Sequence, residues 1–163
     1  MDINRFIESL LTPEEQQELQ TSLKLLEDKN YSDFYEKNHD LISSILFIED
    51  YEEFEEFTDE DDLDTECFCF AFLCAKNHGI QVGGYEDDLT ERFIAFFDSK
   101  IPGYQEINAI IHGEKIYTDY DGNDNFKESL VKINQVLSAH HLQLIVFENC
   151  VYCACEYTVL LLE

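Results

Sequence analysis

The chain contains few basic residues. Lys and Arg number 10 among 163 residues, against 36 Asp and Glu, so the formal net charge is −26. A surface this negative repels the phosphates of nucleic acids, which excludes direct DNA or RNA binding, and it disfavours anionic membrane surfaces for the same reason. The charge instead favours a basic protein as a partner.

Long apolar runs are also missing. No stretch approaches the roughly 20 apolar residues that a helix needs to span a bilayer. The N-terminus, MDINRFIESLL, has an acidic second residue and only a short apolar segment, which is not typical of a secretory signal. We therefore expect a cytoplasmic protein that does not insert into a membrane.

Catalytic motifs are absent as well. The sequence has no phosphate-binding loop, dinucleotide fingerprint or Gly-x-Ser-x-Gly elbow. Cys150 follows the pair His140 and His141, so a thiol–imidazole dyad is conceivable, but nothing in the sequence positions one. We expect no catalytic residues and no cofactor, with a small thiol- or metal-dependent enzyme as an alternative.

Six cysteines form two clusters, CFCFAFLC from Cys67 to Cys74 and CVYCAC from Cys150 to Cys155. Structural zinc needs four ligands in a tetrahedron. On a helix, however, Cys67 and Cys69 would point about 160° apart, so they would not share an ion. Free cysteines are often buried, and cytosolic thiols are normally reduced. We expect reduced thiols in the core and no bound metal.

The segment from Asp119 resembles a calcium loop in part. Asp119, Asp121 and Asn123 occupy alternate positions, but the sixth position is Asp124 instead of Gly and the twelfth is Leu130 instead of Glu. The bidentate ligand is therefore missing. The pattern predicts a turn that leads into a helix.

Despite its charge, the composition favours a folded chain. Hydrophobic residues make up 45% of the sequence and aromatic residues 13%, whereas a disordered acidic chain has low hydrophobicity. The length fits a single acidic domain over residues 1–163. Repulsion among the carboxylates should still lower stability, most of all at low salt.

The first third predicts helices. An apolar-periodic helix begins at Asp2, and a second has Thr12 as its N-cap, Pro13 at its first position and Glu15 as the capping-box partner. A third short helix begins near Ser32. The apolar run at 45–48 predicts a buried strand. Thr58 is the expected cap of a central buried helix that includes 67–75, for which a strand is the alternative.

The second half predicts a mixture of helices and strands. A short strand at 80–82 precedes an amphipathic helix over 87–101, and a further strand is expected from Lys115 to Tyr120. Asn125 should cap the last helix, with Glu128 as its partner. LQLIVFE and YCACEYTVLLL then predict a hairpin. The fold class is α+β: N-terminal helices packed with a small, mostly antiparallel sheet that ends in a C-terminal β-hairpin.

The most unusual segment is IEDYEEFEEFTDEDDLDTE, residues 48–66, in which 12 of 19 residues are carboxylates. No Lys or Arg occurs from Asn38 to Ala75. Tyr51, Phe54 and Phe57 are three residues apart, which fits a helical turn or two and not a strand.

Charged segments are often only solvated faces, and that alternative stands. Aromatic anchors inside a polar ring are typical of tight protein interfaces, however, and negative patches attract basic partners. The segment therefore predicts a partner-binding site with two aromatic anchors and a set of carboxylates. Its residues are Tyr51, Glu52, Glu53, Phe54, Glu55, Glu56, Asp59, Glu60, Asp61, Asp62 and Asp64.

These observations predict a non-catalytic acidic protein that inhibits a basic partner. Basic surfaces commonly bind nucleic acids, so a toxin or a nucleic-acid-binding protein is the expected target. The favoured version is an immunity protein that neutralises a cognate nuclease-type toxin. The alternative is a DNA mimic whose carboxylates imitate phosphates and block a DNA-binding protein. The sequence makes no prediction of oligomeric state.

Overall fold

A computed structural model describes residues 3–60, 63–83, 89–98, 101–118, 125–148 and 157–163. The chain divides into two compact units. The first comprises Met1–Lys76 with Asn149–Ala154, and the second comprises Asn77–Glu148 with Cys155–Glu163. The expectation of a single domain stays a prediction.

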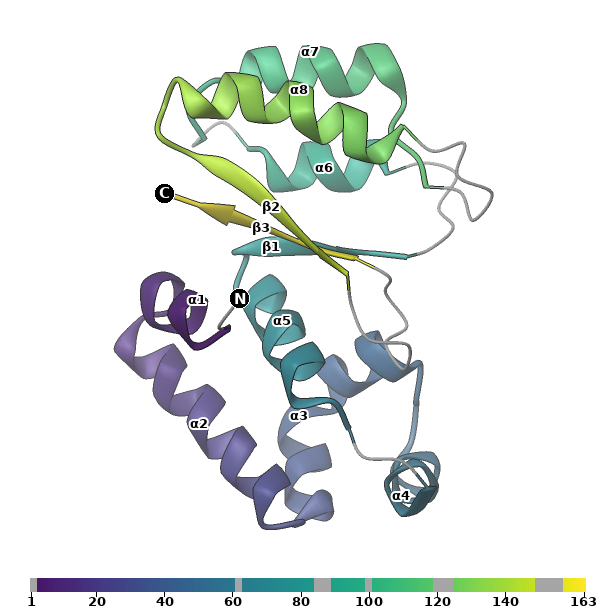
Figure 1. Ribbon diagram of the computed structural model, residues 1–163. Helices are drawn as coiled ribbons and strands as arrows, with labels where there is room; N and C mark the ends of the chain where they lie inside the picture. The colour runs from purple at the N-terminus through teal and green to yellow at the C-terminus, as the bar shows by residue number, and fades with distance from the viewer. Residues whose placement is uncertain (1–2, 61–62, 84–88, 99–100, 119–124, 149–156) are drawn as a thin grey trace. The chain divides into compact units, whose positions relative to one another are not determined.

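The described part of the first unit is helical (Figure 1). α3 contacts both α2 and α5, and α4 packs on α3. The helices of this unit are α1 (Ile3–Leu10), α2 (Pro13–Glu27), α3 (Tyr31–Leu46), α4 (Tyr51–Glu60) and α5 (Thr65–Ala75).

The start of α2 confirms the predicted capping box. The Glu15 N–H donates to Thr12 Oγ1 at 3.3 Å, and the Thr12 N–H donates to Glu15 Oε2 at 2.9 Å. Pro13 occupies the first turn, where its missing N–H costs nothing.

The predicted strand at 45–48 is wrong. Ile45 and Leu46 form the last turn of α3, which is longer than the short helix expected. Phe47 then ends the helix in the left-handed conformation, with φ 57° and ψ 27°. Ile45 and Ile48 are buried as predicted, but the burial comes from helix packing, which a short apolar run does not distinguish from a strand.

The predicted cap of the central helix is also wrong. Thr58 lies inside α4, where its hydroxyl donates to the Glu55 carbonyl at 3.0 Å. The N-cap of α5 is Asp64, whose Oδ1 accepts from the Cys67 N–H at 2.7 Å. The helix that follows is buried on every side over residues 67–73, so the preference for a helix over a strand is confirmed.

A buried polar pair joins α2 to α3. Ser22 Oγ donates to Asn38 Oδ1 at 3.0 Å, and Asn38 Nδ2 donates to the Phe34 carbonyl at 2.8 Å. Asn38 has φ −124° and ψ 18°, so α3 is kinked there. The pair satisfies polar groups that would otherwise be buried without partners in the helical core.

The second unit contains a three-stranded antiparallel sheet in the order β1-β3-β2 (Figure 1). The predicted α+β class is thereby confirmed, including a C-terminal strand pair. The elements are β1 (Gly79–Val82), α6 (Thr90–Phe96), α7 (Tyr104–Glu114), α8 (Phe126–Ser138), β2 (Gln143–Glu148) and β3 (Tyr157–Leu162).

The strand predicted from Lys115 to Tyr120 does not form over 115–118, apart from a single bridge residue at Thr118. Asn125 does precede α8, but it makes no side-chain cap. Its amide instead accepts from the Tyr117 N–H and donates to the carbonyls of Glu114 and Lys115. Asn125 thus fixes the segment that follows α7, a long-range role that a local capping pattern does not reveal.

The core of the second unit lies between the sheet and its helices. Phe93, Phe97 and Phe126 are fully buried in it, together with Ile107 and Ile133. β1 and β3 approach so closely at Gly79 that a Cβ there would lie 2.2 Å from the Val159 carbonyl oxygen. Only glycine fits this contact without a shift of the sheet.

Candidate partner-binding surface

The acidic segment forms a helix, α4, that has one aromatic side and one acidic side. Phe54 is 0% exposed, with its ring centroid 6.1 Å from that of Phe34 and 5.4 Å from that of Tyr35. Tyr31 meets the same ring edge-on at 6.2 Å. The buried ring fixes which side of α4 faces outward.

Hydrogen bonds hold the start of α4. The Glu53 N–H donates to Asp50 Oδ1 at 3.0 Å, and the Glu49 N–H donates to Glu53 Oε2 at 3.2 Å. Tyr35 Oη on α3 donates to the Glu49 carbonyl at 3.1 Å. Carboxylates at a helix N-terminus are also stabilised by the helix dipole. The carboxylates of Asp50 and Glu53 are therefore held in place.

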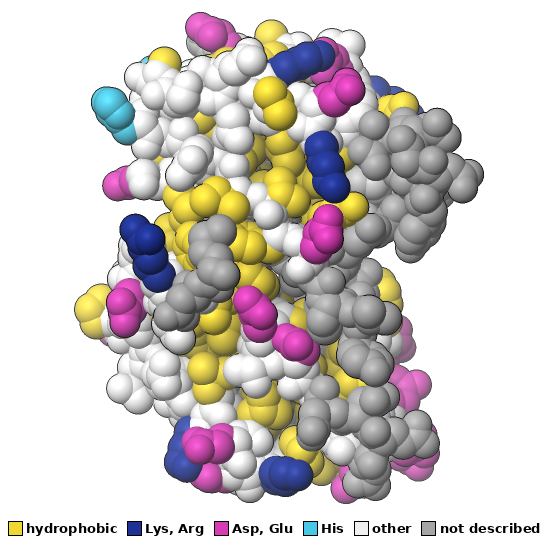
Figure 2. Space-filling view, viewed as in Figure 1, with side chains coloured by type: hydrophobic (Ala, Val, Ile, Leu, Met, Phe, Trp, Pro, Cys, Tyr) yellow, Lys and Arg dark blue, Asp and Glu magenta, His cyan; other side chains and the backbone are white. Residues whose placement is uncertain are grey.

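The outward side of α4 and the residues just before it carry only acidic charges. We define the α4 acidic face as the exposed carboxylates Glu49, Asp50, Glu52, Glu53, Glu55 and Glu56. In the view of Figure 2, Asp and Glu side chains lie over α4 at the lower right. Among described residues, every ion pair joins other groups and none includes this face. None of these carboxylates therefore lies within ion-pair distance of a described cation.

The nearest following cation in the sequence is already engaged. Lys76 Nζ lies 2.8 Å from Glu18 Oε2 and 5.1 Å from the centroid of the Phe72 ring. Its position at the end of α5 suits the helix dipole as well. Lys76 thus stabilises contacts between α2 and α5 and forms no ion pair with the α4 acidic face.

The predicted site residues fall into different environments. Tyr51 is half-buried, with its ring 5.6 Å from that of Tyr35. Phe54 as a contact anchor is wrong, because its ring is buried in the first unit. Asp64 is a half-buried helix cap. Asp59 and Glu60 belong to the last turn of α4, and Asp61 and Asp62 lie outside the described residues.

One exposed residue beside the site was not predicted. Phe47 is 74% exposed and lies two residues before Glu49. Phe47 belongs to the apolar run 45–48, where a buried strand was expected, so its exposure was not predicted. The helical spacing of Phe34, Ile42 and Ile45, all buried, is the signal that would have extended α3 and left Phe47 at its end.

The cysteines differ from the prediction of reduced thiols. Cys67 is disulfide-bonded, so that expectation is wrong for this residue. Cys69 has a free thiol, and burial in α5 raises its pKa to about 12. Cys150, Cys153 and Cys155 lie outside the described residues.

No group of three or more His, Cys, Asp or Glu side chains is arranged to hold a metal ion within the described ranges. The calcium-like positions Asp119, Asp121, Asn123 and Asp124 lie outside those ranges. Leu130, at the twelfth position, is a buried core residue of α8.

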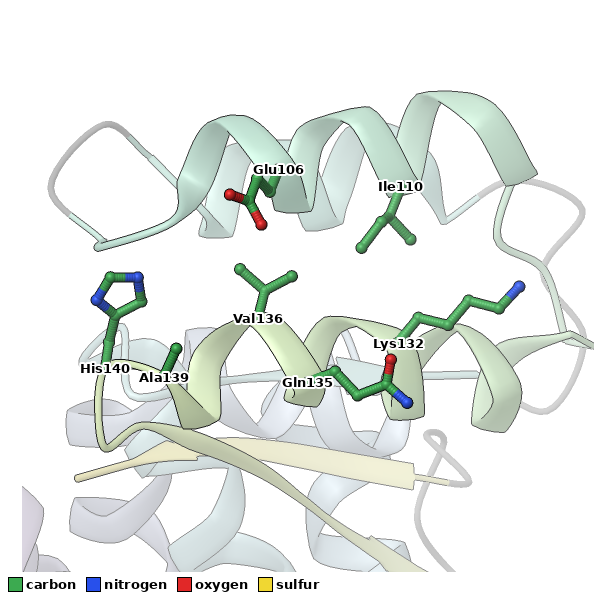
Figure 3. Close-up of a pocket in the computed structure, with 7 residues that line it drawn as sticks. All are labelled: Glu106, Ile110, Lys132, Gln135, Val136, Ala139 and His140. Atoms are coloured by element: carbon green, nitrogen blue, oxygen red, sulfur yellow. The ribbon is translucent and has the colours of Figure 1, made fainter.

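The second unit has a shallow groove of about 480 Å³ between α7 and α8 (Figure 3). Ile110 and Val136 project into it from the two helices. Lys132 at one end is already paired with Glu114, and this hydrogen bond lowers the pKa of Glu114. Glu106 and His140 are exposed at the rim, so the groove offers mixed charge and no enclosed reaction site.

No described helix is both long and apolar enough to cross a bilayer. The fold and the surface together define a class: an α+β protein with an acidic helix on its surface. Comparison with known proteins adds no family to this class, because no family model, curated protein or solved structure matches the chain.

Proposed function

We propose that the protein is a non-catalytic inhibitor that binds a basic protein partner through the α4 acidic face. One observation carries the proposal: α4 buries Phe54 and turns Glu52, Glu53, Glu55 and Glu56 outward, and none of them is paired with a described cation. Such an arrangement attracts a basic surface and accelerates encounter with it.

The target class follows from the charge of its surface. Proteins that act on nucleic acids carry basic faces for the phosphates. An acidic protein that covers such a face would block it. We favour an immunity protein that neutralises a nuclease-type toxin, and the DNA-mimic inhibitor of a DNA-binding protein is the second version.

We also propose that the protein acts in the cytoplasm, where a nuclease-type toxin would reach its substrate. The disulfide at Cys67 weighs against this compartment, because cytosolic thiols are normally reduced. Counting the thiols of protein isolated from its native host therefore tests the location as well as the bond.

The function is tested by recovering the partner and assaying it. Immobilised protein should retain a basic protein from a host lysate at low salt, and the purified partner should lose its nuclease or DNA-binding activity at one equivalent of inhibitor. The same assay with Glu52, Glu53, Glu55 and Glu56 changed to Gln should need more inhibitor. A partner without basic character, or full inhibition by the Gln variant at every salt concentration, would contradict the proposal.

A further inference from the structure

Phe47 is the candidate for a contact with the partner in addition to the α4 acidic face. Among described residues, the exposed large hydrophobic side chains are Phe47, at 74%, and Val131 on α8, at 59%. A single exposed apolar side chain is ordinary on a protein surface, so its exposure alone carries no inference. The backbone and the neighbours of Phe47 set it apart from Val131.

The backbone of Phe47 has a conformation that suits glycine. Its φ of 57° and ψ of 27° lie in the left-handed region, where a Cβ approaches the following carbonyl oxygen. Glycine usually takes this place at the end of a helix because it has no Cβ. The interaction that ends α3 is a backbone one, from the Phe47 N–H to the Ser43 carbonyl at 2.9 Å, and glycine would make it equally well.

The ring of Phe47 adds little to the fold. The aromatic contacts of the first unit include Tyr31, Phe34, Tyr35 and Phe54, and no described ring pairs with Phe47. A largely exposed ring gains little from packing to offset the left-handed backbone that carries it. The ring is therefore available for a contact outside the folded monomer.

The neighbours of Phe47 indicate what would cover it. Glu49 and Asp50 follow after the buried Ile48, and hydrogen bonds with Glu53 hold the Glu49 backbone and the Asp50 carboxylate at the start of α4. An exposed aromatic ring that precedes a run of carboxylates in the chain matches an apolar recess bordered by Lys or Arg. An Arg side chain can also lie over the ring face, where the guanidinium is attracted to the π electrons.

We infer that Phe47 is the aromatic anchor of the partner-binding surface, and that its occupant is a basic protein with an Arg- or Lys-bordered apolar recess. The inference rests on the proposed function and replaces Phe54 as the anchor. The α4 acidic face then accelerates association, and Phe47 slows dissociation.

The first test needs no partner. Phe47→Gly should keep the melting temperature of the parent or raise it by a few degrees, because the strained backbone is relieved and an exposed ring is lost. Val131→Ala is the matched control, since it removes the other exposed apolar side chain, and it should change the melting temperature little. A marked fall for Phe47→Gly would show that the ring stabilises the fold, and would overturn the inference.

The second test uses a defined probe, a display library of random peptides about twelve residues long, selected against the parent protein. Selected peptides should combine Arg or Lys with apolar residues. Phe47→Gly should weaken their binding about thirty-fold or more, mainly through faster dissociation at low and high salt alike. Val131→Ala should leave the binding unchanged.

The outcomes separate the two proposals. Equal binding by Phe47→Gly, or selected peptides without Arg and Lys, overturns the anchor. The proposed function survives a failure of the anchor if the variant with Glu52, Glu53, Glu55 and Glu56 changed to Gln binds the peptides more slowly than the parent at low salt. If the Gln variant binds like the parent while Phe47→Gly does not, the acidic face has no part in binding and the proposed function fails.

Discussion

At the scale of single residues, the aromatic positions of α4 have different roles. The spacing of Tyr51, Phe54 and Phe57 predicts a helix, and the structure has one. The spacing does not tell which ring lies in the core, because that depends on α3, which brings Phe34 and Tyr35 against Phe54. Phe54, which was predicted to contact a partner, therefore packs α4 against α3 instead.

Truncation of Phe54 tests this structural role. Phe54→Ala should lower the free energy of unfolding by about 3–5 kcal/mol, as is usual for a fully buried Phe. Urea unfolding followed by circular dichroism measures the change. Glu55→Gln, an exposed neighbour on the same helix, should change it by less than about 0.5 kcal/mol. A cost of Phe54→Ala as small as that of the control would mean that the ring is not in the core.

The cysteines give a second test at this scale. Denatured, unreduced protein should titrate at least two fewer thiols than fully reduced protein, because Cys67 is disulfide-bonded. Native Cys69 should resist alkylation near pH 8, since burial raises its pKa to about 12 and keeps the thiol protonated. Equal thiol counts before and after reduction would contradict the bond at Cys67.

The raised pKa of Cys69 also has a consequence for stability. The unfolded thiol ionises above its ordinary pKa of about 8.5, whereas the folded thiol does not. The contribution of Cys69 to stability is thus fully present below that pH, and it is lost as the pH rises toward about 12.

At the scale of helices and strands, local patterns predicted the elements that local contacts stabilise. The capping box at Thr12 and the short strand ending at Val82 are of this kind. The role of Asn125 depends on residues more distant in the sequence. Asn125 bonds to positions eight to eleven residues away, beyond the reach of a capping pattern.

The two edge strands of the sheet also bond to side chains that lie beyond the reach of a local sequence pattern. Asn134 on α8 accepts from the Leu144 N–H at 2.6 Å and donates to the Leu144 carbonyl at 3.0 Å. The Arg92 guanidinium on α6 donates to the Gln81 carbonyl of β1, the opposite edge strand. Side chains from helices thus occupy part of each strand edge and hinder its pairing with another chain.

Asn134→Ala should lower the free energy of unfolding by about 1–3 kcal/mol, because two backbone groups of β2 lose their partner. It should also increase aggregation on mild heating, which light scattering measures. Gln135→Ala, at the next and exposed position of α8, is the control and should change neither property. Equal behaviour of the two variants would contradict the role assigned to Asn134.

At the scale of the whole molecule, the main feature is the excess of negative charge and its effect on stability. The net charge of −26 implies self-repulsion that salt screens. We expect the melting temperature to rise with NaCl, as the Debye length shortens to about 3 Å at 1 M. Differential scanning fluorimetry at several NaCl concentrations measures this effect. A melting temperature that stays flat or falls with salt would contradict it.

The composition and the element pattern were enough to predict the fold class. They were not enough to predict the candidate surface, because its outward side depends on the packing of α4 against α3. The helix and the exposure of its carboxylates were predictable from sequence, since a carboxylate-rich helix must turn its charges to water wherever it packs. The exposure of Phe47 could not be predicted without knowing that α3 ends at Leu46.

The central claim is that the position of the carboxylates on α4, and not the total charge alone, drives binding to a basic partner. Two charge-matched variants separate these effects. One changes Glu52, Glu53, Glu55 and Glu56 to Gln. The other changes four exposed glutamates elsewhere to Gln, namely Glu8, Glu14, Glu36 and Glu128.

The most direct measurement is the association rate constant with the recovered partner from about 50 to 500 mM NaCl, over which the Debye length shortens from above to below about 10 Å. We predict that the α4 variant associates about tenfold more slowly at the lowest salt, with a flatter salt dependence, and that the variant with four other glutamates changed stays close to the parent. Equal slowing by both variants would show that total charge is sufficient. No slowing of the α4 variant would show that its carboxylates are only a solvated face.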